Sequence, residues 1–267
     1  MLNHFETAAK MRGVWEIMGG NGSLWIDTTV ASSTGAPAGL EDIKAALGRV
    51  RGSDAVVLNP GQAQRFAGHF GGPRRPGLLI RVDWTNVFRG KDHPTPCNEP
   101  VYCPIALPDD ALILGASAAV ATLLLGLDET FEANNVRHVG RLARQASKQN
   151  TPIVIDVRPL GPRTSSENLP DTILLGTSMA LELGADILVI PYPGKDALGT
   201  AVSFVSVPII LDIDRVAREE REELMRAVSG TGIRGVILRE EIFASHAIEA
   251  QIKEIRAVQR DSAKDTP

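Results

Sequence analysis

Residues 182–194 read ELGADILVIPYPG, and this stretch decides the fold that the sequence predicts. A helix is expected to end at Gly184, because glycine readily adopts the backbone conformation that follows a helix. The apolar run of residues 187–190 has no polar alternation, and it ends on Pro-Tyr-Pro-Gly, which is typical of a loop. A strand buried on both faces of a parallel sheet has this pattern.

Seven other short apolar segments, each bounded by turn residues, predict further strands. They are residues 23–27, 54–58, 77–83, 118–125, 152–157, 207–212 and 235–238. Segments of helical character follow these strands, so the chain predicts a (β/α)8 TIM barrel with an extra N-terminal helix at residues 3–19. A doubly wound open sheet is the alternative fold, but no Gly-x-Gly-x-x-Gly fingerprint follows a strand.

The chain length of 267 residues fits one barrel, so we expect a single domain over residues 1–267, with residues 259–267 as a disordered tail. The net charge of −4 gives no reason to expect nucleic acid or a membrane surface as partner. No signal peptide is visible, and no apolar run reaches the roughly 18 residues that a membrane span needs. We therefore expect a cytoplasmic protein.

Residues 85–108 form the longest segment without a helix or strand pattern, and we expect an irregular loop there. A loop of this length in a compact domain is usually functional or mobile. It holds the two cysteines of the chain, Cys97 and Cys103. Two cysteines make no disulfide framework, so we favour a reduced pair over a local bridge.

The site of a (β/α)8 barrel lies at the carboxyl ends of its strands and in the loops that follow. These positions are rich in aspartate and arginine in this chain. The candidate catalytic residues are Asp27, Asp156 and Lys195, and the candidate substrate-binding residues are Asn59, Arg81, Asp83, Arg158, Tyr192, Asp212 and Arg239. Buried charges need partners, so the alternative is that the aspartates pair with the arginines across the barrel or cap the next helix.

A carboxylate cluster of this kind could also bind a divalent cation, because hard cations take oxygen ligands. However, no histidine lies at a predicted strand end, and no histidine or cysteine spacing fits zinc. We therefore expect neither a metal nor a cofactor.

Several stretches together resemble the class I aldolase family that includes the archaeal-type fructose-bisphosphate aldolases and the autoinducer-processing thiolase. They are WIDT at residues 25–28, GLED at 39–42, GSDAVVLNPG at 52–61, ALELGADI at 180–187, VPII at 207–210 and GVIL at 235–238. The likeness runs from about residue 23 to 258, and the order and spacing of the stretches carry it. The resemblance implies a TIM barrel, carbon–carbon lyase chemistry and a homo-oligomer.

The sequence departs from this family at the residues that carry its chemistry. The family pattern Ala-Asp-Ile-Val-Lys-Thr-Lys-Tyr places a lysine on the sixth strand where Val189 stands, and a Schiff base requires an amine. The family's Tyr-Pro-Arg-Gly falls on residues 158–161, which read RPLG. Its phosphate-binding Gly-Gly and Gly-Arg-Asn fall on residues 212–213 and 239–241, where acidic groups would repel a phosphate unless Arg239 compensates. Asp27 is the matched catalytic position that remains.

Three functions follow from these observations. The first is an aldolase-superfamily barrel without Schiff-base chemistry, that is, a pseudoenzyme or a divergent member. The second is a lyase or transferase of altered mechanism that uses Asp27, Asp83, Asp156 and Asp212. The third is an aldolase that uses Lys195. For all three, a small carbonyl or sugar-like compound is the expected ligand.

Overall fold

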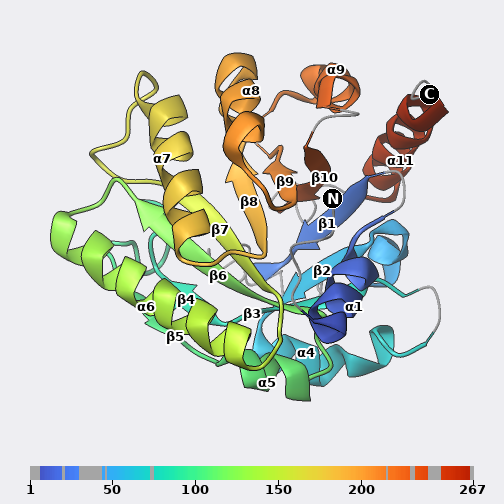
Figure 1. The fold of residues 1–267 in the computed structure, drawn as a ribbon, viewed down its shortest axis with the longest axis horizontal. Helices are drawn as coiled ribbons and strands as arrows, with labels where there is room; N and C mark the ends of the chain where they lie inside the picture. The colour runs from blue at the N-terminus through green and yellow to red at the C-terminus, as the bar shows by residue number, and fades with distance from the viewer. Residues whose placement is uncertain are drawn as a thin grey trace.

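Eight parallel strands form a closed barrel, which confirms the predicted fold (Figure 1). The computed structural model describes residues 7–19, 22–29, 44–45, 47–72, 75–214, 216–228, 232–239 and 248–264. The strand order around the barrel is β1-β10-β9-β8-β7-β6-β3-β2. The strands are β1 (Ser23–Asp27), β2 (Ala55–Leu58), β3 (Gly77–Arg81), β6 (Ala118–Leu125), β7 (Ile153–Pro159), β8 (Ile187–Pro191), β9 (Ile209–Asp212) and β10 (Ile233–Leu238).

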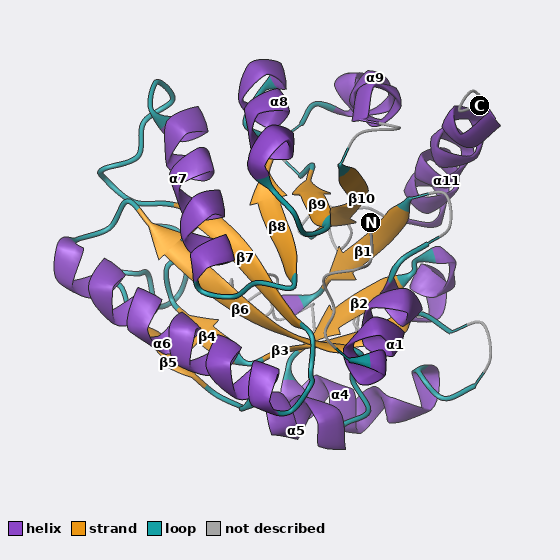
Figure 2. Cartoon of the chain, in the orientation of Figure 1, coloured by secondary structure: helices purple, strands orange, loops and turns teal. Residues whose placement is uncertain are grey.

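Helices follow the barrel strands along the chain and lie outside them (Figure 2). They are α4 (Pro60–Phe66), α5 (Pro108–Ile113), α6 (Glu129–Lys148), α7 (Leu169–Glu182), α8 (Lys195–Phe204), α9 (Arg218–Val228) and α11 (Ile248–Lys264), with the 3-10 helices η1 (Val50–Gly52) and η2 (Ala67–His69). The motif at residues 39–42 lies outside the described residues. Within the described part of the chain, no helix is long and apolar enough to span a membrane.

The C-terminal helix corrects the expectation of a disordered tail from residue 259. α11 continues to Lys264. Val258 and Gln259 are buried, and the Gln259 side-chain amide donates a hydrogen bond to the Ser23 carbonyl at 3.3 Å. These contacts hold the helix against the barrel past the point where the sequence becomes polar.

The segment of residues 85–108, expected to be irregular throughout, contributes to a small antiparallel sheet near its start and near its end. β4 (Asp83–Thr85) pairs with β5 (Tyr102–Pro104), and Trp84 lies opposite Cys103. The Asn86 side chain joins the two strands, because its amide donates to the Glu99 carbonyl at 2.8 Å and its oxygen accepts from the Val101 N–H at 2.7 Å. Both cysteines are free, as favoured from the sequence.

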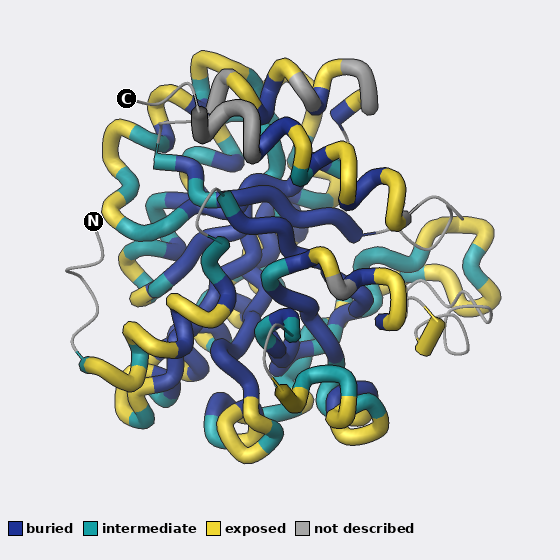
Figure 3. The backbone as a smooth tube through the Cα atoms, turned by 90° about the vertical axis from the view of Figure 1, so that its right-hand side faces the viewer, coloured by how far each residue is buried: buried dark blue, intermediate teal, exposed yellow. Residues whose placement is uncertain are grey.

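The barrel has an apolar interior that is separate from the layer between strands and helices. Alternate strand residues face inward, since successive side chains of a strand point to opposite sides. This interior core includes Trp25, Ala55, Val57, Leu79, Ala118, Val120, Val154, Ile187, Val189, Ile210 and Ile237. Figure 3 shows the buried strands within a shell of helices whose outer faces are exposed.

The helix α1 (Ala8–Ile17) closes the amino-terminal end of the barrel, in agreement with the predicted extra helix. Val14 and Ile17 join the interior core, and the Trp25 indole donates a hydrogen bond to the Ile17 carbonyl at 2.8 Å. Gly13 permits this close approach, because a side-chain carbon there would overlap the carbonyl oxygen of Ser117. One end of the barrel is thus sealed by apolar contacts.

Toward the opposite end the inward-facing residues become polar. Two positions beyond a core residue, the side chain faces the interior again, one layer closer to the carboxyl end. Asp27, Arg81, Thr122, Asp156 and Asp212 follow Trp25, Leu79, Val120, Val154 and Ile210 in this way. Strand alternation therefore places a layer of polar side chains at the carboxyl end of the barrel, which we call the mouth.

Asn135 of α6 completes the hydrogen bonding of β6 where its neighbour β3 has ended. Its side-chain oxygen accepts from the Leu124 N–H at 2.8 Å, and its amide donates to the Thr122 carbonyl at 3.0 Å. β3 pairs with β6 only through Ala118, Ala119 and Val120, so these backbone groups have no strand partner on that side. Asn135 is buried and supplies both partners.

We predict that Asn135→Ala lowers the free energy of unfolding by about 2–4 kcal/mol, because it leaves two buried backbone groups without a partner. Urea unfolding followed by circular dichroism measures this change. The matched control is Asn134→Ala on the exposed face of the same helix, which should cost about 0.5 kcal/mol or less. Equal losses in the two variants would contradict the assigned role.

Candidate active site

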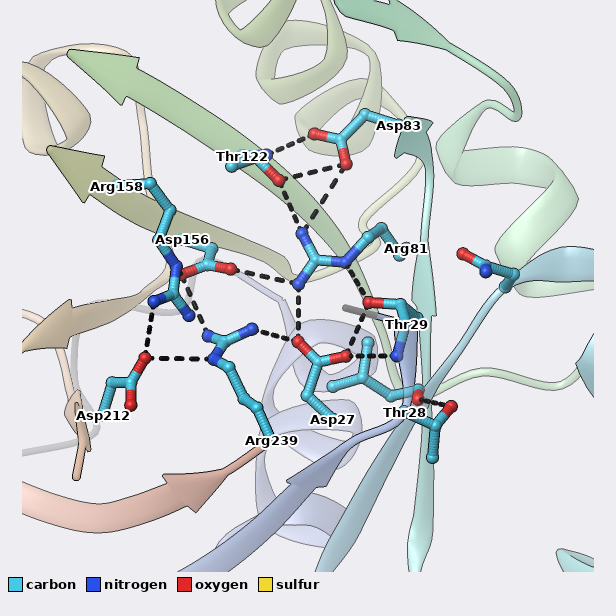
Figure 4. Close-up of polar contacts among 12 residues, drawn as sticks. Asp27, Thr28, Thr29, Arg81, Asp83, Thr122, Asp156, Arg158, Asp212 and Arg239 are labelled. Atoms are coloured by element: carbon cyan, nitrogen blue, oxygen red, sulfur yellow. Dashed lines mark hydrogen bonds and ion pairs between the residues drawn. The ribbon is translucent and has the colours of Figure 1, made fainter. Parts of the chain in front are cut away.

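Three aspartates and three arginines meet at the mouth of the barrel (Figure 4). We call this set the Asp–Arg cluster. Its members are Asp27, Arg81, Asp156, Arg158, Asp212 and Arg239. They come from the ends of β1, β3, β7 and β9 and from the residue that follows β10. The structure thus brings together six residues that the sequence predicted for the site, in the paired arrangement that was the alternative to a catalytic one.

Asp27 is the most enclosed member, with no exposed side-chain surface. One carboxylate oxygen accepts from Arg81 Nη2 at 2.8 Å and also from Arg239 Nη1. The other accepts from the backbone N–H of Thr29 at 2.8 Å and from its hydroxyl at 2.6 Å. Both oxygens of the matched catalytic aspartate are therefore engaged within the protein.

Asp156 contacts all three arginines. Its Oδ2 accepts from Arg81 Nη2 at 3.0 Å, while its Oδ1 accepts from Arg158 Nε at 2.9 Å and from Arg239 Nη2 at 3.0 Å. Because Arg158 lies two residues further along β7, both side chains point toward the mouth from one strand. Asp156 is the central anion of the cluster.

Asp212 links the two remaining arginines. Its Oδ2 lies 2.6 Å from Arg158 Nη1 and 3.1 Å from Arg239 Nε, and its Oδ1 accepts from the Asp214 N–H at 3.0 Å. Asp214 in turn accepts from the backbone N–H of Arg239 at 2.9 Å. The loop after β9 therefore fixes both the backbone and the side chain of Arg239.

Charge pairing dominates the protonation of the cluster. Burial alone would raise the pKa of the Asp27 carboxyl, but Arg81, Arg239 and the Thr29 hydrogen bonds outweigh it and hold that pKa well below its ordinary value. Burial would likewise raise the pKa of Asp212, and Arg158 and Arg239 reverse this. Carboxyls held this strongly in the ionised form are poor proton donors near neutral pH.

Asp83 lies beside the cluster in a different environment. Its oxygens accept from the Thr122 backbone N–H, from the Thr122 hydroxyl at 3.1 Å and from the Tyr102 hydroxyl at 3.0 Å, while Arg81 Nη1 is 3.6 Å away. Burial raises the pKa of the Asp83 carboxyl, and the attraction of Arg81 only partly offsets this. Asp83 thus holds the β4–β5 sheet to the barrel through Thr122 of β6, and Tyr102 joins it from β5.

Three other predicted site residues have no recorded contact with the cluster. Asn59 precedes α4, where its backbone N–H donates to the Gln62 side chain at 3.0 Å. Tyr192 is half-buried and packs against the apolar layer under the helices. Lys195, which the sequence placed in a loop, is the exposed first residue of α8.

Two residues of the site were not predicted from the sequence. Tyr102 reaches Asp83 only because β5 pairs with β4, and no local pattern indicated that pairing. Thr29 bridges Asp27 and Arg81, since its hydroxyl donates to Asp27 and accepts from Arg81 Nε at 2.6 Å. Its position two residues beyond Asp27 was the available signal, because alternation points both toward the mouth.

No lysine lies on a barrel strand. All seven lysines of the sequence fall within the described residues, on α1, on the outer helices or in the connecting segments. They are Lys10, Lys44, Lys91, Lys148, Lys195, Lys253 and Lys264. Lys10 pairs with Asp186 at 2.8 Å, just before β8 begins and hence at the end opposite the mouth. Val189 is buried in the interior core beside Asp156 on the neighbouring strand.

The arrangement leaves little room for cation binding by the carboxylates. Within the described ranges, no group of three or more histidine, cysteine, aspartate or glutamate side chains could hold a metal ion. The guanidinium groups occupy the positions between the aspartates. The donors that face the mouth are therefore cationic nitrogens, which repel a metal ion.

Comparison with known proteins agrees with the resemblance seen in the sequence. The model of the DeoC/LacD family aldolases matches residues 23–254. An uncharacterized aldolase of Saccharolobus solfataricus is 26% identical over 219 residues, which cover 79% of each chain. The class 1 fructose-bisphosphate aldolase of Thermoproteus tenax is 29% identical over 186 residues, which cover 69% of this chain and 65% of that one.

Solved structures share the fold. A crystal structure of an archaeal fructose 1,6-bisphosphate aldolase has a TM-score of 0.72 at 20% identity and covers 93% of this chain and 98% of its own. A structure from a study of the mechanism of a Schiff-base-forming fructose-1,6-bisphosphate aldolase has a TM-score of 0.74 at 22% identity, with 94% and 98% coverage.

We predict that Asp156→Asn lowers the free energy of unfolding by about 3–5 kcal/mol, because it leaves a buried arginine charge uncompensated. Chemical denaturation at neutral pH measures the change. Glu167→Gln, in the exposed loop after the same strand, is the control and should stay within about 0.5 kcal/mol of wild type. If the two variants were equally stable, the cluster would not hold the barrel together.

Acid should weaken the fold through Asp27 and Asp212. Their folded-state pKa values lie below the ordinary value, so their stabilising effect is complete above about pH 4 and is lost as the pH falls further. Each carboxyl should contribute a slope of up to about 1.4 kcal/mol per pH unit. Asp83 acts in the opposite sense, because its raised pKa gives stability that is lost as the pH rises through it.

The variant Asp27→Asn tests this assignment. Denaturation curves between pH 5 and pH 2 should give a shallower loss of unfolding free energy for the variant than for wild type, by up to about 1.4 kcal/mol per pH unit. Asp171→Asn, at an exposed position, should keep the wild-type slope. An unchanged slope in the Asp27 variant would show that its carboxyl has an ordinary pKa.

Proposed function

The chain belongs to the DeoC/LacD family of aldolases, and from this membership we propose that it is a member without Schiff-base chemistry. It is a pseudoenzyme or a divergent member whose mouth binds a small molecule without forming a covalent bond to it. The observation that carries the proposal is the absence of lysine from the barrel strands, together with the buried Val189 where the sequence resemblance places the family lysine. Without an amine in the interior, no imine can form there.

The paired aspartates support this proposal over an altered acid–base mechanism. A general base needs a free oxygen and a pKa near the working pH. The oxygens of Asp27 accept hydrogen bonds from Arg81, Arg239 and Thr29, and the pKa of its carboxyl lies far below neutrality. A mouth closed by Asp–Arg pairs therefore counts against the altered mechanism.

The position of Lys195 counts against an aldolase that uses this residue. A Schiff-base lysine is activated by desolvation or by a neighbouring cation. Lys195 is exposed at the start of α8, and no described contact directs its side chain toward the cluster. An exposed side chain lacks the desolvation that activates such a nucleophile.

The ligand we propose is a small carbonyl or sugar-like compound without a phosphate group. Relatives are named as fructose-bisphosphate aldolases, so a phosphorylated sugar is the natural comparison. In this chain the family's phosphate positions hold Asp212, and Arg239 is committed to three aspartates. A homo-oligomer and a cytoplasmic location are the assembly and compartment that we propose with this function.

Borohydride reduction in the presence of dihydroxyacetone tests for Schiff-base formation. Reduction converts an imine into a stable amine. A reacting lysine would therefore gain the mass of the ketone, less one water lost on imine formation and plus two hydrogens added by reduction. We predict no added mass on any lysine, because none of them lies on a barrel strand. Intact-protein mass spectrometry followed by peptide mapping measures this.

A class 1 fructose-bisphosphate aldolase treated in parallel is the positive control. The variant Lys195→Ala separates the remaining alternative, since an adduct that disappears in this variant would identify Lys195 as the nucleophile. An adduct on any lysine in the wild-type protein, at a yield comparable with the positive control, would overturn the proposal.

A further inference from the structure

Every guanidinium nitrogen of the Asp–Arg cluster except one has at least one acceptor among the described residues. Each guanidinium group has three nitrogens, and all those of Arg81 and Arg239 have an acceptor in the described structure. Arg158 directs Nε to Asp156 and Nη1 to Asp212. Its Nη2 is buried and has no hydrogen-bond partner among the described residues.

This nitrogen belongs to the cluster member that is closest to solvent. The Arg158 side chain is 13% exposed, whereas Arg81 is 8% and Arg239 is 3% exposed. Buried donors in folded proteins nearly always have an acceptor, so an unpartnered donor on the most exposed member of the cluster points to an oxygen from outside the chain. The two ion pairs of Arg158 hold its guanidinium plane in a fixed direction.

The charge of the cluster determines which oxygen suits this donor. Three carboxylates balance three guanidinium groups, and Asp83 adds either no charge or one negative charge. Among the described residues, the cluster therefore has no excess positive charge to hold a phosphate or a carboxylate. An anion would also approach the Asp212 oxygen that lies 2.6 Å from Arg158 Nη1.

We propose that Arg158 Nη2 is the anchoring donor of the ligand site and that it takes a carbonyl or hydroxyl oxygen of an uncharged compound, not a phosphate. The inference rests on the proposed function, because it concerns a ligand that binds reversibly at the mouth without forming an imine. It assigns a ligand contact to a position where the family has a different residue, and it predicts selection against phosphorylated sugars.

Titration with a matched pair of probes tests the proposal. Dihydroxyacetone and dihydroxyacetone phosphate differ only in the phosphate group, and each is titrated into the full chain labelled with 15N-arginine. The Nη2 signal of Arg158, assigned with Arg158→Lys, should shift with dihydroxyacetone, while the signals of Arg81 and Arg239 should move much less. Isothermal titration calorimetry should give a dissociation constant at least ten-fold larger for the phosphorylated probe.

The variant Arg158→Lys keeps the positive charge but loses the planar donor, and it should weaken dihydroxyacetone binding about ten-fold or more. Arg163→Lys is the matched control, because Arg163 is 53% exposed in the loop after the same strand. Its binding should equal that of wild type. The wild-type titration stands independently if Arg158→Lys does not fold.

Three results would overturn the proposal. One is tighter binding of the phosphorylated probe, and another is an equal loss of binding in the two variants. The third is an Nη2 signal that neither probe moves, which would indicate that this donor is satisfied by water alone. A lysine adduct after borohydride treatment would instead refute the proposed absence of Schiff-base chemistry. The shift of the Arg158 signal is measured without borohydride, so it would still test the Arg158 contact separately.

Discussion

Mutual neutralisation of buried charge is the constraint on which the mouth of this barrel depends. An isolated carboxylate or guanidinium group inside a protein costs several kcal/mol, and only close partners with good geometry offset that cost. Asp27, Asp156 and Asp212 each contact at least two arginines, and removal of any one member would leave one buried charge of the opposite sign in excess. The cluster also joins β1, β3, β7, β9 and the end of β10, and it therefore fixes strands around most of the barrel.

Pairing of the aspartates with arginines is unfavourable for acid–base catalysis by the same aspartates. An aldolase that works through an imine needs a nucleophilic amine and a group that can exchange protons near neutral pH. In this chain the interior position beside Asp156 is taken by Val189, and Asp27 is locked in its ionised form by two arginines and Thr29. Buried ion pairs are weak evidence for stability when compared with apolar residues, and recognition of a ligand is the role that we propose for the six charges at the mouth. Arg158, with one nitrogen left for an external oxygen, is where such recognition would begin.

The sequence predicted the barrel well because burial on both faces leaves continuous apolar runs, as in residues 118–125, which form β6 with the same bounds. The position of Asp27 and Asp156 near the carboxyl ends of predicted strands also predicted that they reach the mouth, whereas Lys195, selected by the same rule, lies exposed on α8. The sequence could not decide between free and paired aspartates, because pairing depends on side chains that are far apart along the chain. The β4–β5 sheet was missed for the same reason, since Trp84 and Cys103 become neighbours only through the fold. α11 extends beyond residue 258, where the sequence predicted its end, and the polar Gln259 side chain there has a buried hydrogen-bond partner.

The closure of the barrel by β1 and β10 has a consequence for how the protein is made. Asp27 and Arg239 are separated by 212 positions, yet they form one of the central ion pairs of the mouth. During synthesis from the N-terminus, Asp27 emerges from the ribosome long before its partner exists, at rates of about 5–20 residues per second. Until β10 arrives, β1 has an open edge, and Asp27 has Arg81 and Thr29 as partners but lacks Arg239. The final ring closure is therefore a late event, and the half-built barrel is the species most exposed to chaperones and proteases.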